Sequence, residues 1–161
     1  MRDEDIELWR RIAHFQIDSG RERLSFLARL ARDNGWTLAY AGGALQEYKR
    51  FCFLAVSAGH PVTPSDEVDQ VWHLHLLYTR SYWGEFCRKA LQTELHHGPT
   101  EGGGAEREKF TDWYTRTLES YERAFGTAPP RAYWPTPGER MAGIRFERVD
   151  RDRFWVLRKW W

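Results

Sequence analysis

TPSDEVDQVWHLHLL, residues 63–77, is the stretch of this sequence that most constrains its fold. It opens with a hydroxyl residue, a proline and acidic residues, a pattern typical of a helix N-terminus, so we expect a helix to begin near Pro64. On a helical wheel the apolar side chains of residues 68–77 cover most of the circumference, which is typical of a buried helix. The stretch therefore predicts a central helix around which other elements pack.

Apolar residues at helical spacing predict further helices on both sides of this stretch. These helices are expected at residues 5–17, 24–34, 37–57, 81–91 and 110–125. The second of them is expected to end at Asn34-Gly35, because Asn and Gly can both take the left-handed conformation that closes a helix. The segment 81–91 either continues the central helix or bends away from it. Residues 95–104 contain a glycine run and are expected to form a mobile loop.

The last part of the chain is expected to differ from the rest. Its prolines, Pro129, Pro130, Pro135 and Pro137, are interpreted as excluding a further helix. Residues 144–146 and 153–157 alternate apolar and charged side chains, which suggests a small hairpin.

The predicted fold class is mostly α. The length of 161 residues suits one domain. We expect a single-domain bundle of about five to six helices in residues 1–126. A proline-rich segment with a small C-terminal β-hairpin is expected to follow in residues 127–161.

Composition narrows the classes of function. The chain has 24 basic and 23 acidic residues, a net charge of +1, so no strong field draws it to nucleic acid or to an anionic membrane. It has neither an apolar run of about 18 residues nor an N-terminal signal peptide, so we expect a cytoplasmic protein without a membrane span. No phosphate loop is present, and no nucleotide cofactor is expected.

Five of the six histidines lie between positions 60 and 97, the densest group of chemically active side chains in the chain. Asp69 and His73 are four residues apart and share a helix face. The carboxylate there can ligate a metal ion beside the histidine, or accept its ring N–H. His73 and His75 are separated by roughly 200° on a helix, so they cannot both chelate one ion without a break in the helix. Which of them faces a site is left open.

Further metal ligands are available close by in the sequence. His96 and His97 can supply nitrogen atoms from the adjoining loop, and Cys87 can supply a thiolate, because zinc accepts mixed nitrogen, sulfur and oxygen ligands. The cofactor that we expect is zinc or another divalent metal ion. Its expected ligands are His73, His75, His96 and His97. For any single histidine, the alternative is a hydrogen-bonded residue of the core.

The stretch from Pro64 to His75, followed by YTRSYW at residues 78–83, resembles the signature of the glycine-rich domain-containing protein-like family. In that family an acidic D-x-V-W-H-x-H stretch precedes a tyrosine. Short bacterial members also resemble this chain around residues 95–100, 134–135 and 154–156. The resemblance extends from about residue 36 to residue 157.

The family resemblance directs attention to a few residues without implying a reaction. Those residues are Asp69, Trp72, His73 and His75, with His96 and His97 next. Plant members of the family carry long glycine-rich tails for which RNA binding is suspected. This chain has only the short run from Gly102 to Gly104, so nucleic acid is not an expected partner.

Two hypotheses from different classes follow. The first is a soluble helical domain with a His/Asp site on the central helix that binds zinc or another divalent metal ion. In it, Asp69 or Glu67 is the catalytic base of a hydrolysis, and Trp72 and Tyr82 are binding residues. The alternative is a non-catalytic protein-interaction module in which the histidines and Asp69 form a buried polar network. Its partner would be another protein or a second copy of the chain, bound through the C-terminal aromatic segment that ends in Trp160 and Trp161.

Overall fold

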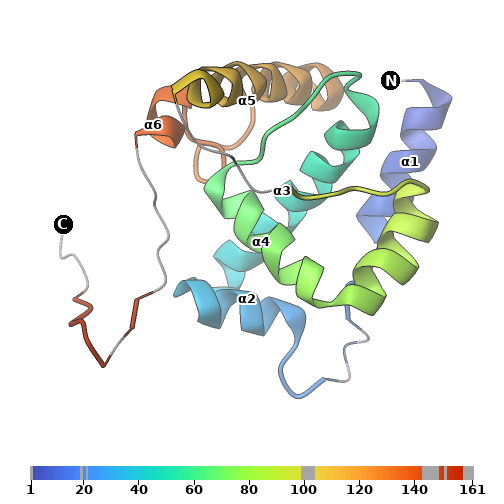
Figure 1. Cartoon of the computed structure of the whole chain (residues 1–161). Coiled ribbons are helices and arrows are strands. Elements are labelled where there is room, and N and C mark those ends of the chain that lie inside the picture. The colour runs from blue at the N-terminus through green and yellow to red at the C-terminus, as the bar shows by residue number, and fades with distance from the viewer. Residues whose placement is uncertain are drawn as a thin grey trace.

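The fold is a set of helices packed around one long helix, α3 (Figure 1). The computed structural model describes residues 2–18, 20, 22–98, 104–142, 149–150 and 152–157, with only the backbone described at 104–107. In this part of the chain there are seven helices and no strand. They are α1 (Asp3–His14), α2 (Phe26–Asn34), α3 (Leu38–Ser57), α4 (Asp66–Leu77), η1 (Arg80–Leu91), α5 (Gly104–Phe125) and α6 (Pro137–Met141). The prediction of a mostly helical protein is confirmed.

Helix α3, rather than the stretch at residues 66–77, occupies the centre of the fold. It contacts α1, α2, α4, η1 and α5, whereas α4 packs against α2, α3 and η1. The hydroxyl of Thr37 caps its N-terminus by accepting from the Tyr40 N–H at 3.1 Å. The expectation that α4 is the central helix is therefore wrong, because α4 leaves one side, including His73 and Leu77, open to solvent.

Helix α4 begins two residues later than expected and stops at a sharp break. The Ser65 hydroxyl, not Thr63, accepts from the Val68 N–H at 3.2 Å. Thr63 instead donates its backbone N–H to the Thr117 hydroxyl of α5 at 3.0 Å. The backbone leaves the helical region at Tyr78 and resumes as the π-helix η1, so the chain bends here rather than continuing.

The C-terminal part corrects two expectations. Pro137 is the first residue of α6, because a proline at that position gives up an N–H that would have no partner within the helix. The hairpin is not supported, since residues 153–157 form no strand. Its other expected arm, residues 144–146, lies outside the described residues, as do residues 99–103 of the expected mobile loop.

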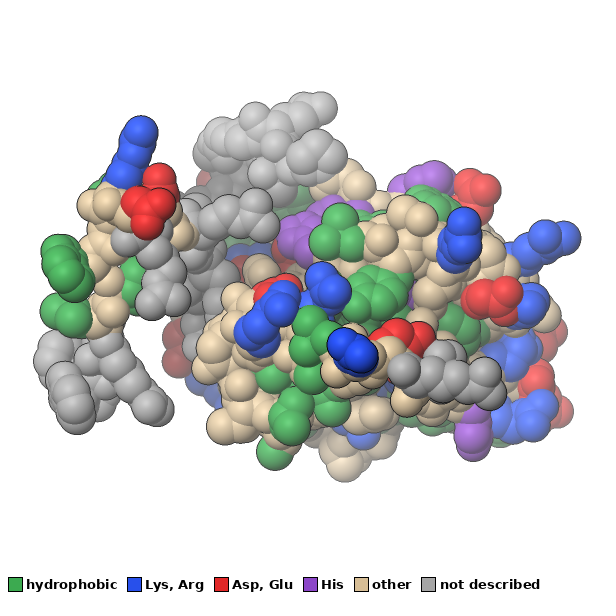
Figure 2. Space-filling model, turned by 90° about the horizontal axis from the view of Figure 1, so that it is seen from below, with side chains coloured by type: hydrophobic (Ala, Val, Ile, Leu, Met, Phe, Trp, Pro, Cys, Tyr) green, Lys and Arg blue, Asp and Glu red, His purple; other side chains and the backbone are tan. Residues whose placement is uncertain are grey.

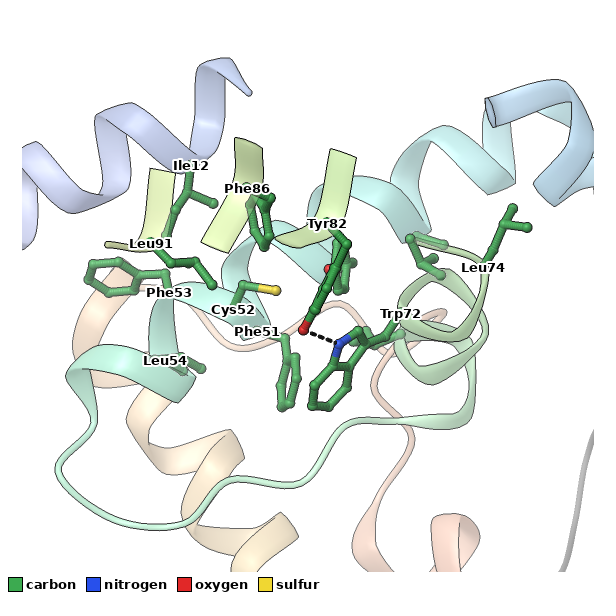
Figure 3. Close-up of a cluster of buried hydrophobic side chains, with 14 of the residues drawn as sticks. Ile12, Phe51, Cys52, Phe53, Leu54, Trp72, Leu74, Tyr82, Phe86 and Leu91 are labelled. Carbon is green, nitrogen blue, oxygen red and sulfur yellow. Dashed lines mark hydrogen bonds between the residues drawn. The ribbon is translucent and has the colours of Figure 1, made fainter. Parts of the chain in front are cut away.

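The hydrophobic core brings aromatic side chains from α3, α4 and η1 into contact. Figure 3 shows Trp72 of α4 and Tyr82 of η1 facing each other beside Phe51 of α3. The π-helical turn of η1 is wider than an α-helical turn, and its buried residues recur at intervals of four to five: Tyr82, Phe86 or Cys87, and Leu91. This spacing holds one face of η1 against the core.

A buried carboxylate fastens α5 to the central helix. Glu47 of α3 accepts hydrogen bonds from the Tyr121 hydroxyl and from the Trp134 indole N–H, both at 2.9 Å, and pairs with Arg50. A carboxylate that is almost fully buried needs such partners to offset its lost hydration. None of the helices in the described residues is long and apolar enough to cross a membrane.

Substituting Gly43 in α3 tests how closely the proline-rich segment packs on the central helix. A Cβ atom at Gly43 would collide with the Tyr133 side chain, so we expect Gly43→Ala to lower the free energy of unfolding by about 1 to 3 kcal/mol. The matched control is Gly42→Ala, where a Cβ meets nothing within 4 Å. Gly42→Ala should leave stability unchanged or raise it by up to about 1 kcal/mol. Chemical denaturation measures both; equal effects would contradict this packing.

Candidate functional site: a His/Asp/His group

The candidate site begins on the open side of α4. Asp69 and His73 lie one helical turn apart, and the Asp69 Oδ2 and His73 Nε2 atoms are 3.8 Å from each other. The side chain of Asp69 is 20% exposed and that of His73 is 52% exposed. The shared helix face predicted from their spacing is therefore present, and solvent reaches it.

His97 completes the group from the loop that follows η1. Its Nε2 atom lies 2.8 Å from Asp69 Oδ1, and its ring centroid is 4.6 Å from that of His73. One ligand atom from each of the three residues lies within 4.8 Å of the others. Within the described residues this is the one group of at least three His, Cys, Asp or Glu side chains with such geometry. Figure 2 shows histidine side chains reaching the surface on one face of the molecule.

The loop that carries His97 is held in place by a buried tyrosine. The Tyr82 hydroxyl accepts from the Trp72 indole N–H at 2.8 Å (Figure 3). The same hydroxyl donates to the Leu95 carbonyl. Two residues beyond Leu95, the His97 ring lies against Trp72 with the centroids 4.3 Å apart. Trp72 and Tyr82 were expected from the sequence to be binding residues; in the structure Trp72 packs against the His97 ring, and Tyr82 holds the loop that carries it.

The electrostatics of the group favour a charged pair. The hydrogen bond to Asp69 raises the pKa of His97 above its usual value, and the partial burial of the ring opposes this effect. The carboxylate therefore stabilises a positive charge on the loop, whether that charge is a proton on His97 or a cation held between the side chains.

His75 points away from the group into the core. It is fully buried, and its Nδ1 and Nε2 atoms lie 2.9 Å from the Tyr48 hydroxyl and 3.3 Å from the Ser81 hydroxyl. Burial lowers the pKa of His75 to about 3, so the ring is neutral at physiological pH. The structure thus resolves the choice between His73 and His75: His73 faces the group, and His75 is a hydrogen-bonded residue of the core.

The other expected site residues lie apart from the group. His96 is 72% exposed and faces Glu94, with its Nε2 atom 3.0 Å from the Glu94 carboxylate. Glu67 is fully buried and is not one of the three grouped residues. Cys87 is buried, and its burial raises the pKa of the thiol, which keeps it protonated.

The pairing of Asp69 with His97 is the feature that sequence reasoning missed. The two residues are 28 positions apart, and both were candidates, but nothing in the spacing assigns one to the other. The sequence shows two adjacent histidines, His96 and His97, in a loop. Their adjacency does not predict which of the two rings turns toward α4.

Comparison with known proteins supports the family resemblance. The model of a family described as UCP032817-like matches residues 35–112, a segment that contains Asp69, His73 and His97. Glycine-rich domain-containing protein 1 of Arabidopsis thaliana is 27% identical over 105 residues. That alignment covers 65% of this chain and 11% of the relative, so this chain spans about a tenth of the relative's length. No solved structure matches the chain.

These matches show a likeness to a glycine-rich-domain-like family over just under half of the chain, residues 35–112. The described part of this chain is mostly helical. Glycine-rich domain-containing protein 1, to which the chain is similar, is a much longer plant protein.

The buried histidine makes the stability of the protein depend on pH. An unfolded histidine has a pKa near 6.5, so below that pH the unfolded chain binds a proton that the folded His75, with a pKa of about 3, excludes. Above about pH 6.5 the neutral His75 does not reduce the free energy of unfolding. Its effect grows as the pH drops toward 3, and the free energy of unfolding falls. Between pH 7 and pH 5 we expect a loss of about 2 kcal/mol.

Denaturation of the wild type and of His75→Gln at both pH values isolates this effect. The glutamine does not titrate, whereas the other histidines contribute equally in both proteins. The difference in stability between pH 7 and pH 5 should therefore be smaller in the variant by about 2 kcal/mol. An identical pH dependence in the two proteins would show that His75 is not the buried neutral residue described above.

Proposed function

We propose that Asp69, His73 and His97 hold a divalent metal ion, zinc in the first instance, and that the site supports hydrolysis by a metal-activated water. The observation that carries this proposal is the convergence of three ligand atoms within 4.8 Å at a place that solvent reaches. Two imidazoles and one carboxylate are also the ligand types of a known class of catalytic zinc sites.

The distances are compatible with one shared ion. Zinc binds nitrogen and oxygen at roughly 2.0 to 2.2 Å, so the ligand atoms of a tetrahedral site are roughly 3.3 Å apart. The Asp69–His97 and Asp69–His73 separations of 2.8 and 3.8 Å lie on either side of that value. A shared ion would require rotations that bring one ligand atom of each side chain to about this separation from the other two, from a starting spread of at most 4.8 Å. The same ligand set also suits ferrous iron, so metal analysis has to identify the ion.

The exposed side chain of His73 lets water reach the proposed site. Three protein ligands leave one tetrahedral position for water, and a bound metal ion would supply a hydroxide nucleophile at neutral pH. Asp69 is the carboxylate of this group, and in this proposal it acts as a ligand of the ion, which replaces the role of catalytic base expected from the sequence. Trp72 lies against His97 and shields that side of the ring from water. Glu67 lies outside the group and is given no part.

The alternative, a protein-interaction module, is supported by two other observations. The direct bond between Asp69 and His97 already provides each with a partner, as a structural polar network requires. Residues 154–157, Phe-Trp-Val-Leu, expose between 62% and 96% of their surface, and Trp155 is the most exposed of them. Such an apolar segment suits a protein partner or a second copy of the chain. Trp160 and Trp161 lie outside the described residues.

Metal binding by protein purified without a polyhistidine tag tests the first proposal. We expect one zinc ion per chain by elemental analysis and calorimetry. We also expect His73→Ala to weaken the affinity by at least about 100-fold, because one of three ligands is lost. His73 is exposed, so the variant should fold as the wild type does. His96→Ala is the matched control, since His96 is exposed on the same loop but belongs to no such group.

Three results would contradict the metal proposal. These are the absence of any zinc uptake, a His73→Ala variant that binds as tightly as the wild type, and an equal loss in His96→Ala. If no metal ion binds, and neither chelator nor zinc changes the thermal midpoint, the interaction module is the better account.

A further inference from the structure

A second group of reactive side chains lies where α5 passes the turn after α3, and it shares no residue with the His/Asp/His group. His60 Nε2 is 2.7 Å from the Ser120 hydroxyl oxygen, and His60 Nδ1 is 2.8 Å from the Pro61 carbonyl oxygen. Arg123 donates to the same Ser120 oxygen at 2.7 Å. The Ser120 hydroxyl, the His60 imidazole and the carbonyl that orients this imidazole therefore form a chain of hydrogen bonds.

The hydrogen-bond partners determine the direction of each bond. A carbonyl can only accept, so His60 carries its proton on Nδ1, and in the neutral ring Nε2 is then an acceptor. A guanidinium can only donate, so Ser120 accepts from Arg123 and directs its own proton to His60 Nε2. This is the arrangement in which a histidine activates a serine as a nucleophile, with a third group holding the ring in the required tautomer.

Ser120 and Arg123 line a cavity of about 220 Å³ between α1, α3 and α5. Its apolar wall is formed by Phe53, Leu54 and Ala124. Asp5 of α1 and Arg123 of α5 add one charge of each sign to the lining, so the cavity has no net charge to attract a charged acyl group. A cavity of this size and lining admits a short uncharged aliphatic group next to the serine.

We propose that Ser120 is an acyl-accepting nucleophile, with His60 as its general base, and that this site takes short-chain acyl esters. The Ser120 oxygen bonds to the acyl carbon while its proton moves to His60 Nε2. The bond from the acyl carbon to the leaving oxygen then breaks, and His60 returns the proton to the departing alcohol. A water molecule releases the acid by the same two proton transfers, so the net reaction converts ester and water to acid and alcohol. Arg123 supplies positive charge beside the reacting oxygen.

Acetylation by p-nitrophenyl acetate tests this proposal. We expect intact-protein and peptide mass spectrometry of the wild type to show one acetyl group on Ser120, formed together with a burst of p-nitrophenol. His60→Gln should slow this acetylation on the order of 100-fold or more, because the base is lost. Ser120→Ala should abolish it. Thr115→Ala is the matched control, because Thr115 lies on the same helix outside the cavity and donates its hydroxyl to the Thr111 carbonyl, so this variant should react like the wild type.

The proposal is overturned if Ser120 stays unmodified, if His60→Gln reacts at the wild-type rate, or if Thr115→Ala loses reactivity equally. In any of these cases the bonds of Ser120 only fasten the turn to α5. Thermal melting of each variant confirms the fold. Should Ser120→Ala fail to fold, Ser120→Cys retains the packing, and the introduced thiol should be acetylated faster with His60 present than in the double variant with His60→Gln. Equal rates would also overturn the proposal.

Discussion

The Tyr82 hydroxyl is the contact on which the candidate metal site depends. It accepts from the Trp72 indole of α4 and donates to the Leu95 carbonyl of the loop after η1. Trp72 and Tyr82 are both buried, so losing either bond would leave a polar atom without water to replace its partner. The bonds therefore hold the start of the loop against α4. His97, two residues further on, is thereby brought over Trp72 and next to Asp69.

Helix α4 separates two kinds of histidine chemistry on its two sides. The inward side carries His75, which burial keeps neutral among Tyr48, Ser81 and Phe86. The outward side carries Asp69 and His73, which solvent reaches. Because positions two residues apart fall on nearly opposite sides of a helix, the same short stretch supplies a buried histidine at position 75 and an exposed one at position 73. The contacts of His75 in the core thus fix the orientation of α4, and with it the positions of Asp69 and His73 on the solvent side.

Local chemistry predicted most of the helices, and tertiary contacts decided what it could not. Gly35 ends α2 in the left-handed conformation, and Thr37 caps α3, as their residue types predict. The start of α4 was misplaced because Ser65 and Thr63 both offer a hydroxyl, and it is the Ser65 hydroxyl that accepts from the Val68 N–H, while the backbone of Thr63 is bonded to Thr117 of α5. Within the site, the spacing of Asp69 and His73 was informative. The choice of His97 over His96 depends on the Tyr82 contact, which joins residues that the sequence does not relate.

The zinc affinity of Tyr82→Phe, compared with that of Tyr48→Phe, tests most directly whether this tyrosine positions the third ligand. Each variant loses one buried hydroxyl, and each should lose about 1 to 3 kcal/mol of stability. Only Tyr82 holds the loop of His97, whereas Tyr48 bonds to His75 in the core. We expect zinc binding about 10- to 100-fold weaker than wild type in Tyr82→Phe and unchanged in Tyr48→Phe. Wild-type affinity in Tyr82→Phe, or an equal loss in both variants, would contradict the account.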